Sequence, residues 1–212
     1  MTFENVTVDS AEPAPGAVLL AGIPGSGKST VAAALAARFA RAAHIEVDRL
    51  QELIVRGGHS PTPDGDPEAD RQILLRARNG CLLADSFAAA GFLPVLDDVV
   101  VRRSHLDFYR AHAKAVPFRT VILAPGPDKA WERNNARHKR LTTNWAFLDG
   151  VMRAELSGEG VWIDNAEQTV EETVAAVLAA TGLTARADAA TRADAATRAD
   201  ARSNGPVGPV GP

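Results

Sequence analysis

The feature that most constrains the fold is the run of residues 17–30, Ala-Val-Leu-Leu-Ala-Gly-Ile-Pro-Gly-Ser-Gly-Lys-Ser-Thr. Its first five residues are apolar and predict a buried strand, which ends at Gly22. Small residues follow, and apolar side chains then recur at helical spacing through Val31, Leu35 and Phe39. The stretch therefore predicts a strand, a loop of small residues and a helix in direct succession.

These residues match the phosphate-binding P-loop pattern Gly-x-x-x-x-Gly-Lys-Ser in the strand–loop–helix context that it requires. Glycines allow backbone N–H groups to approach a polyphosphate, and the helix N-terminus adds its positive dipole end. Lys28 can reach the β- and γ-phosphates, and the Ser29 hydroxyl can bind Mg²⁺. A glycine-rich turn without a ligand is the alternative, but the eight-residue pattern favours nucleotide binding. The predicted nucleotide-binding residues are Gly22, Pro24, Gly25, Ser26, Gly27, Lys28, Ser29 and Thr30.

Length and composition limit the possible classes of protein. A chain of 212 residues accommodates one α/β domain with a sizeable core. The net charge of −3 gives no support for a nucleic-acid-binding surface. Cys81 is the single cysteine, which excludes an internal disulfide, and its apolar helical neighbours predict a buried structural thiol. With neither a signal peptide nor a long apolar run, we expect a cytoplasmic protein without a membrane partner.

The chain divides into three parts. Residues 1–16 are polar and end in Pro-Ala-Pro-Gly, which predicts a disordered lead-in. Residues 17–182 carry the alternating pattern of a single domain. Residues 183–212 lack apolar bulk and repeat Ala-Thr-Arg-Ala-Asp-Ala, which predicts a low-complexity disordered tail.

Five short apolar runs in the central part predict strands separated by helices. Such an order implies right-handed crossovers and a five-stranded parallel sheet between helical layers, an α/β P-loop NTPase fold. Residues 57–67 consist of turn-forming residues and predict a mobile active-site flap. The predicted strands are 17–21, 44–47, 92–96, 118–123 and 161–164, and the predicted helices are 28–41, 50–55, 68–90, 103–115, 127–139, 147–156 and 169–180.

Three aspartates follow predicted strands, where ligands gather in parallel sheets. Asp48 lies twenty residues beyond Lys28, and we predict that it orients an acceptor hydroxyl and takes its proton. Its alternative role is a helix N-cap. Asp97 and Asp98 end the third strand, and we favour Asp97 on the Mg²⁺ side, while either residue of the pair could instead position the acceptor or cap the following helix.

Three arginines form a further candidate group. Arg133 and Arg137 share one helix face, and Arg140 follows in a polar turn. These guanidinium groups suit a lid that closes over the triphosphate, with Arg137 as the catalytic candidate and both helix arginines as phosphate ligands. A solvated basic helix face is the alternative. The chain has no Asn-Lys-x-Asp sequence for guanine, so ATP is the default nucleotide, and residues 164–165 are candidates for contact with its base.

The P-loop, Ile45-Glu46-Val47-Asp48 and Val95-Leu96-Asp97-Asp98 together resemble the P-loop kinases around chloramphenicol phosphotransferase and the kinase domain of phage polynucleotide kinase. This zeta-toxin-like, AAA-type ATP-binding group has a fold similar to nucleoside and shikimate kinases. The resemblance implies that Asp48 acts on the acceptor hydroxyl and that residues 131–137 form the arginine-bearing helix before the lid.

The two relatives imply different acceptors. Val-Asp-Arg-Leu and the Asp-Asp pair are more similar to the antibiotic phosphotransferase, and the P-loop itself is more similar to the polynucleotide kinase. The polynucleotide relatives have an arginine three residues after the catalytic aspartate, where this chain has Gln51. We therefore predict an ATP- and Mg²⁺-dependent kinase of a small-molecule hydroxyl. The alternatives are a polynucleotide 5′-hydroxyl kinase, a nucleotide-metabolite kinase, and a nucleotide-dependent switch that signals through residues 57–67.

Overall fold

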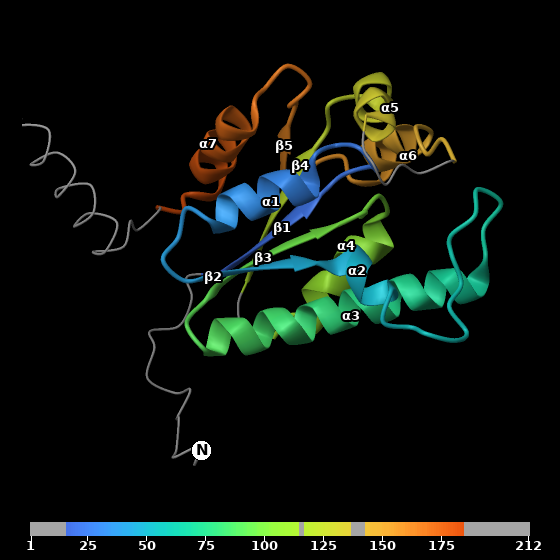
Figure 1. Cartoon of the computed structure of the whole chain (residues 1–212), viewed down its shortest axis with the longest axis horizontal. Helices are drawn as coiled ribbons and strands as arrows, with labels where there is room; N and C mark the ends of the chain where they lie inside the picture. The colour runs from blue at the N-terminus through green and yellow to red at the C-terminus, as the bar shows by residue number, and fades with distance from the viewer. Residues whose placement is uncertain (1–15, 115–116, 137–142, 185–212) are drawn as a thin grey trace, which may run out of the picture.

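The computed structural model describes residues 16–114, 117–136 and 143–184. Within these ranges, five parallel strands form one sheet in the order β2-β3-β1-β4-β5 (Figure 1). The predicted α/β fold with a five-stranded parallel sheet is confirmed. Nearly all of the predicted lead-in and of the predicted tail lies outside the described residues; of the tail, residues 183–184 are described, and Leu183 is buried in the core. The strands are β1 (Ala17–Ala21), β2 (Ala42–Glu46), β3 (Leu93–Asp98), β4 (Phe118–Leu123) and β5 (Val161–Ile163).

Helices cover both faces of this sheet. In Figure 1, α1 and α7 lie over one face, and α3 and α4 lie under the other. Among the described helices, none combines the length and the apolar character that a membrane-crossing segment needs. The described helices are α1 (Lys28–Ala36), α2 (Val47–Gln51), α3 (Pro67–Ala89), α4 (Arg103–His112), α5 (Pro127–Asn135), α6 (Leu148–Glu155) and α7 (Val170–Thr181).

Several predicted boundaries were wrong, and local side chains explain two of them. Asp66 caps α3 by accepting from the backbone of its first turn, so Pro67 is the first helical residue and not the end of the loop. Thr169 forms a capping box with Glu172, which places the start of α7 at residue 170. The third strand ends at Asp98, which confirms that Asp97 and Asp98 end it, and it begins at Leu93 instead of residue 92. The predicted helix 127–139 ends at residue 135, and residues 137–142 lie outside the described part of the chain.

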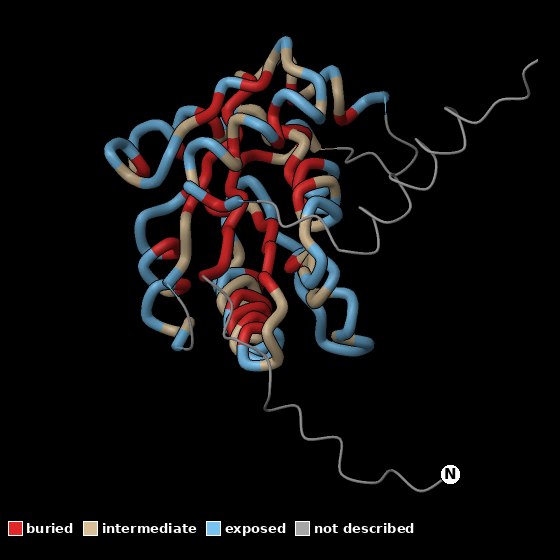
Figure 2. The backbone as a smooth tube through the Cα atoms, turned by 90° about the vertical axis from the view of Figure 1, so that its left-hand side faces the viewer, coloured by how far each residue is buried: buried red, intermediate tan, exposed pale blue. Residues whose placement is uncertain are grey.

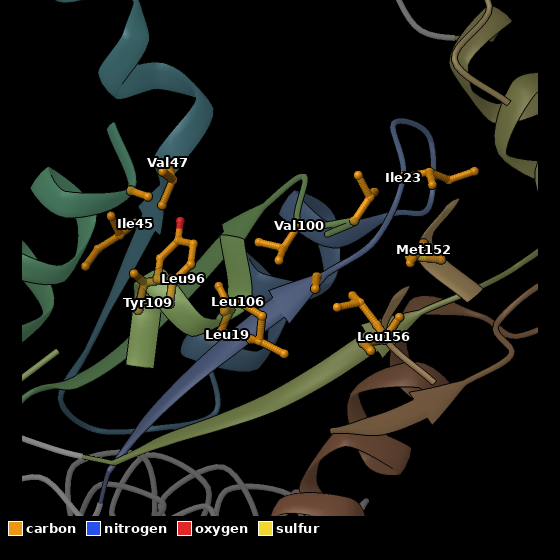
Figure 3. Packing of buried hydrophobic residues seen from close by; sticks show 14 of the residues in the cluster. Leu19, Ile23, Ile45, Val47, Leu96, Val100, Leu106, Tyr109, Met152 and Leu156 are labelled. Carbon is orange, nitrogen blue, oxygen red and sulfur yellow. The ribbon is translucent and has the colours of Figure 1, made fainter. Parts of the chain in front are cut away.

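Alternate residues of the central strands pack on opposite faces of the sheet. Val18 and Val95 contact the core beneath α1 and α7. By contrast, Leu19 and Leu96 contact the core beneath α3 and α4 (Figure 3). The sheet is therefore buried on both sides, as expected for a parallel sheet between helical layers, and Figure 2 shows buried backbone through the middle of the molecule. This alternation decides which way each polar residue at the end of a strand points.

Candidate active site

The P-loop leads into α1 without a side-chain cap. Gly27 is the N-cap, with a φ of 94°, and as a glycine it offers no side-chain acceptor to the first turn of the helix. By contrast, Asp66 and Thr169 cap α3 and α7. The N-cap of α1 therefore lacks the side-chain acceptor that the caps of α3 and α7 supply, which is typical of helix N-termini that bind anions.

Gly25 brings the P-loop against α5. Its φ is 89°, and an added Cβ would lie 2.0 Å from the carbonyl oxygen of Ala130. Only glycine fits this backbone conformation together with this approach. The loop shape thus depends on both the local sequence and the position of α5.

Lys28 and Ser29 lie at the start of α1, and both have partners in the site. The Lys28 Nζ donates to the carbonyl oxygen of Ile23 at 3.0 Å. The Ser29 Oγ donates to Asp97 Oδ1 at 2.7 Å, across 68 residues of sequence. Because that hydrogen bond uses the hydroxyl proton, the Ser29 lone pairs are left for a cation.

The Ser29 and Asp97 oxygens fit a magnesium ion. Among the described residues there is no group of three or more His, Cys, Asp or Glu side chains that could hold a metal ion. Mg²⁺ at nucleotide sites does not need such a cage, because it takes one or two protein oxygens and completes its shell with phosphates and water. The donors that the structure brings together are therefore of the type that Mg²⁺ uses with ATP.

Asp97 and Asp98 point to opposite sides of the sheet because they are consecutive residues of β3. Asp97 faces α1, where it accepts from Ser29 and lies 2.7 Å from His44 Nε2. Asp98 faces α3 and α4 and is fully buried. The two carboxylates therefore belong to different hydrogen-bond groups.

Asp98 anchors a buried polar network. It accepts from Arg76 Nη2 at 2.9 Å, from the Tyr109 hydroxyl at 2.8 Å and from the Val99 N–H at 2.8 Å. The His105 Nε2 lies 3.4 Å from the same carboxylate without a well-aligned hydrogen bond. Burial opposes ionisation of Asp98, but the charge of Arg76 and the neighbouring donors hold its pKa well below the usual range.

Asp48 joins this network through Arg76. It is the second residue of α2, and Glu46 occupies the N-cap position, so the alternative role of Asp48 as the cap is wrong. Its Oδ1 lies 2.9 Å from Arg76 Nη2, and 52% of its side chain is exposed. The surrounding protein keeps part of the water away from the Asp48 carboxyl group even though half of the side chain is exposed, and this desolvation raises its pKa. The Arg76 charge lowers the pKa, the Asp98 charge raises it and the Lys28 charge lowers it. The Lys28 charge of the P-loop is thus among the charges that act on the predicted base.

Sequence reasoning missed Arg76 and Tyr109. Arg76 lies on the buried side of α3, one turn from Gln72 and one turn from Gly80. A charged residue on the buried side of a predicted helix was the sequence signal that could have identified it. Gly80 allows α3 to approach Val47, because an added Cβ would lie 3.0 Å from Val47 Cγ2. This close packing brings Arg76 within reach of α2.

Arg133 and Asn165 lie over the P-loop. The Arg133 Nη2 donates to the carbonyl oxygens of Asn165 at 2.8 Å and Ala166 at 3.0 Å. The Asn165 Nδ2 donates to the carbonyl oxygen of Ser26 at 3.0 Å. An added Cβ on Gly27 would lie 3.9 Å from Arg133 Nη1, so the guanidinium reaches the tip of the loop. Arg137 and Arg140 lie outside the described residues.

A pair of glutamines fixes the start of the loop before α3. The Gln72 side chain accepts from Gln51 Nε2 at 2.9 Å and from the His59 N–H at 2.8 Å, and it donates to the Gly57 carbonyl at 2.7 Å. Gln51 is thus used to hold this loop. That the loop acts as a mobile flap stays a prediction.

The predicted structural role of Cys81 agrees with its position. The thiol is fully buried on α3, and burial raises its pKa to about 12. A thiol in this state is a poor nucleophile.

A family model described as an AAA domain matches residues 18–145, from β1 to the segment before α6. The chain belongs to this AAA domain family. The matched part of the AAA domain contains the P-loop and all three predicted aspartates. A search of curated proteins found no match.

Solved structures share the fold of this AAA domain. An unliganded sugar kinase from Janibacter sp. HTCC2649 has a TM-score of 0.60 at 18% identity, covering 80% of this chain and 95% of that chain. The tunicamycin resistance protein of Deinococcus radiodurans has a TM-score of 0.56 at 16% identity, with coverages of 82% and 99%. The Mycobacterium tuberculosis APS kinase CysC, in complex with AMPPNP and APS, has a TM-score of 0.56 at 16% identity, with coverages of 81% and 100%. At these identities the likeness establishes the fold.

Proposed function

We propose that the protein is a kinase that uses ATP and Mg²⁺ and transfers the γ-phosphoryl group to a hydroxyl of a small organic molecule. One observation carries the proposal. Three separate elements supply the site residues, α1 with Lys28 and Ser29, β3 with Asp97 and α2 with Asp48. The Ser29 hydroxyl nevertheless donates to Asp97, and the Lys28 charge lowers the pKa of Asp48. Phosphate binding, metal binding and acceptor activation thus have candidates within a single site at the carboxyl ends of the strands.

Each residue has a defined task in this proposal. The N–H groups at the start of α1 and Lys28 hold the phosphates, with Arg133 and Arg137 as further phosphate ligands. Ser29 and Asp97 would hold Mg²⁺, which when bound neutralises charge on the phosphates.

Asp48 orients the acceptor and receives its proton. A bond forms between the acceptor oxygen and the γ-phosphorus, and the bond from that phosphorus to the β,γ-bridging oxygen breaks. The proton of the hydroxyl passes to Asp48, whose raised pKa makes it a stronger base than a fully solvated aspartate. Arg76 holds the Asp48 carboxylate in place and favours its ionised form.

The proposed acceptor is a small molecule of antibiotic or metabolite type. The resemblance to chloramphenicol phosphotransferase supports it, and the relatives of similar fold include a sugar kinase and a tunicamycin resistance protein. The net charge of −3 and the use of Gln51 in holding its own loop weigh against a polynucleotide acceptor. We also propose that the protein is located in the cytoplasm.

The test is ADP release from MgATP by the unaltered protein, Asp48→Asn and Lys28→Ala. The acceptor panel holds hydroxylated antibiotics, sugars, nucleosides, adenylylsulfate and 5′-hydroxyl oligonucleotides. We expect one class to stimulate ADP release, with Asp48→Asn lowering that stimulated rate by roughly 10²–10⁴-fold while ATP still binds. Lys28→Ala is expected to abolish turnover. Slow hydrolysis that no acceptor stimulates, and that is equal with and without Asp48, would instead indicate a nucleotide-dependent switch.

A further inference from the structure

His44 contacts the aspartate on the magnesium side of the site. It lies in β2, where Ala42 packs toward the α1 face of the sheet and Ile45 packs toward the other face. His44 therefore points toward α1, as Asp97 does from the neighbouring strand. Its Nε2 lies 2.7 Å from Asp97 Oδ2, with 18% of the His44 side chain and 2% of the Asp97 side chain exposed.

The two oxygens of the Asp97 carboxylate have different donors. Oδ1 accepts from the Ser29 hydroxyl and Oδ2 accepts from His44. An ionised carboxylate has no proton of its own, so Ser29 and His44 supply both hydrogens. The final torsion of an aspartate is broad in the absence of such contacts, and donors on both oxygens restrict it.

The fixed orientation of the Asp97 carboxylate also orients the Ser29 hydroxyl. As long as the Ser29 hydroxyl donates its hydrogen bond to Asp97 Oδ1, the Ser29 lone pairs are directed away from Asp97 and can bind a cation. If the carboxylate turned, the hydroxyl would lose the acceptor that orients it.

We propose that His44 is a positioning residue for the magnesium site, acting through Asp97 on Ser29. The inference rests on the proposed function, because it assumes that Ser29 and Asp97 hold Mg²⁺ with ATP. Hydrogen-bond partners behind metal ligands typically contribute 10–100-fold to metal affinity, which sets the size of the expected effect. His44 was not distinguished from the other histidines by its sequence, since its partner lies 53 residues away.

The experiment measures ATP binding by calorimetry, once with EDTA and once with saturating Mg²⁺. The quantity of interest is the factor by which Mg²⁺ improves ATP affinity. For His44→Leu we expect this factor to fall by about 10–100-fold, with ATP affinity in EDTA unchanged. His44→Gln retains an N–H donor at similar reach and should keep most of the factor. His112→Leu is the matched control, because His112 bonds a backbone carbonyl of its own helix.

The possible outcomes separate the inference from the proposed function. If the unaltered protein binds ATP equally with and without Mg²⁺, the proposed magnesium site fails, and the role of His44 fails with it. If Mg²⁺ improves ATP binding equally in the unaltered protein and in His44→Leu, only the role of His44 is overturned. If His44→Leu does not fold, His44→Asn takes its place, because the shorter amide keeps the polarity but does not reach Asp97. If Mg²⁺ improves the ATP affinity of His44→Asn as much as that of the unaltered protein, the inference is overturned as well.

Discussion

The Arg76→Met substitution removes a guanidinium group that holds two carboxylates. Arg76 Nη2 lies 2.9 Å from Asp98 and 2.9 Å from Asp48, and the Arg76 side chain is only 10% exposed. Methionine fills much of the same volume but carries no charge. Asp98 would retain the Tyr109 hydroxyl and the Val99 N–H while losing its counter-ion inside the protein.

The size of the effect follows from this burial. Removing one partner of a buried ion pair costs roughly 3–5 kcal/mol, because the remaining charge has neither water nor a counter-ion. Domains are stabilised by about 5–15 kcal/mol in total, so the variant is expected to fold with a small margin. For a chain of this length each kcal/mol lowers the melting temperature by about 2–4 °C, which gives a fall of roughly 6–20 °C.

Thermal and urea unfolding of Arg76→Met, Asp98→Asn and the double variant measure the effect. Because the double variant lacks both charges, it is expected to be more stable than the sum of the single effects predicts, by about 0.5–3 kcal/mol. Additive effects, or a melting temperature of Arg76→Met within about 2 °C of the unaltered protein, would refute the reasoning.

The acid side of the stability profile provides a second readout. The pKa of Asp98 is lowered in the folded protein, so its contribution to stability is present above the unfolded pKa of about 3.9 and is lost as the pH falls toward the folded value. Asparagine does not titrate, so Asp98→Asn should lose less stability than the unaltered protein between about pH 4 and pH 2. If the free energies of unfolding of the two proteins fell equally with pH over this range, the loss of stability could not be assigned to the protonation of Asp98.

Two further predictions concern α5 and the buried thiol. Gly25→Ala should destabilise the protein by at least roughly 1–3 kcal/mol, the cost of a strained backbone, because its Cβ would meet the Ala130 carbonyl. The same variant should bind ATP more weakly in calorimetry. Gly150→Ala is the control, since it has open space around its Cβ and should be near neutral. Cys81, whose pKa burial raises to about 12, should react with a thiol reagent only when the protein is unfolded in urea, and fast stoichiometric reaction of the native protein would show that the thiol is accessible.

The P-loop and the order of elements were predictable because their signals are local. Glycine spacing, the lysine and serine that follow, and the change from a strand pattern to a helical pattern all lie within residues 17–39. The parallel sheet follows from the alternation of strands and helices alone, and the structure confirms it. Element ends were less predictable, as at Pro67, because they depend on single caps such as Asp66.

The partners of the site residues depended on tertiary structure. The sequence alone determined that acidic residues follow the second strand and end the third, but it left the roles of Asp97 and Asp98 open. Their separation follows from which face of β3 packs against α1, and that choice depends on the whole core. Arg76 and His44 reach Asp98 and Asp97 across 22 and 53 residues, and such contacts exist only once the sheet has assembled. A buried charged group is tolerated only when it has a partner, so the fold determined that Arg76 contacts Asp98 and that His44 contacts Asp97.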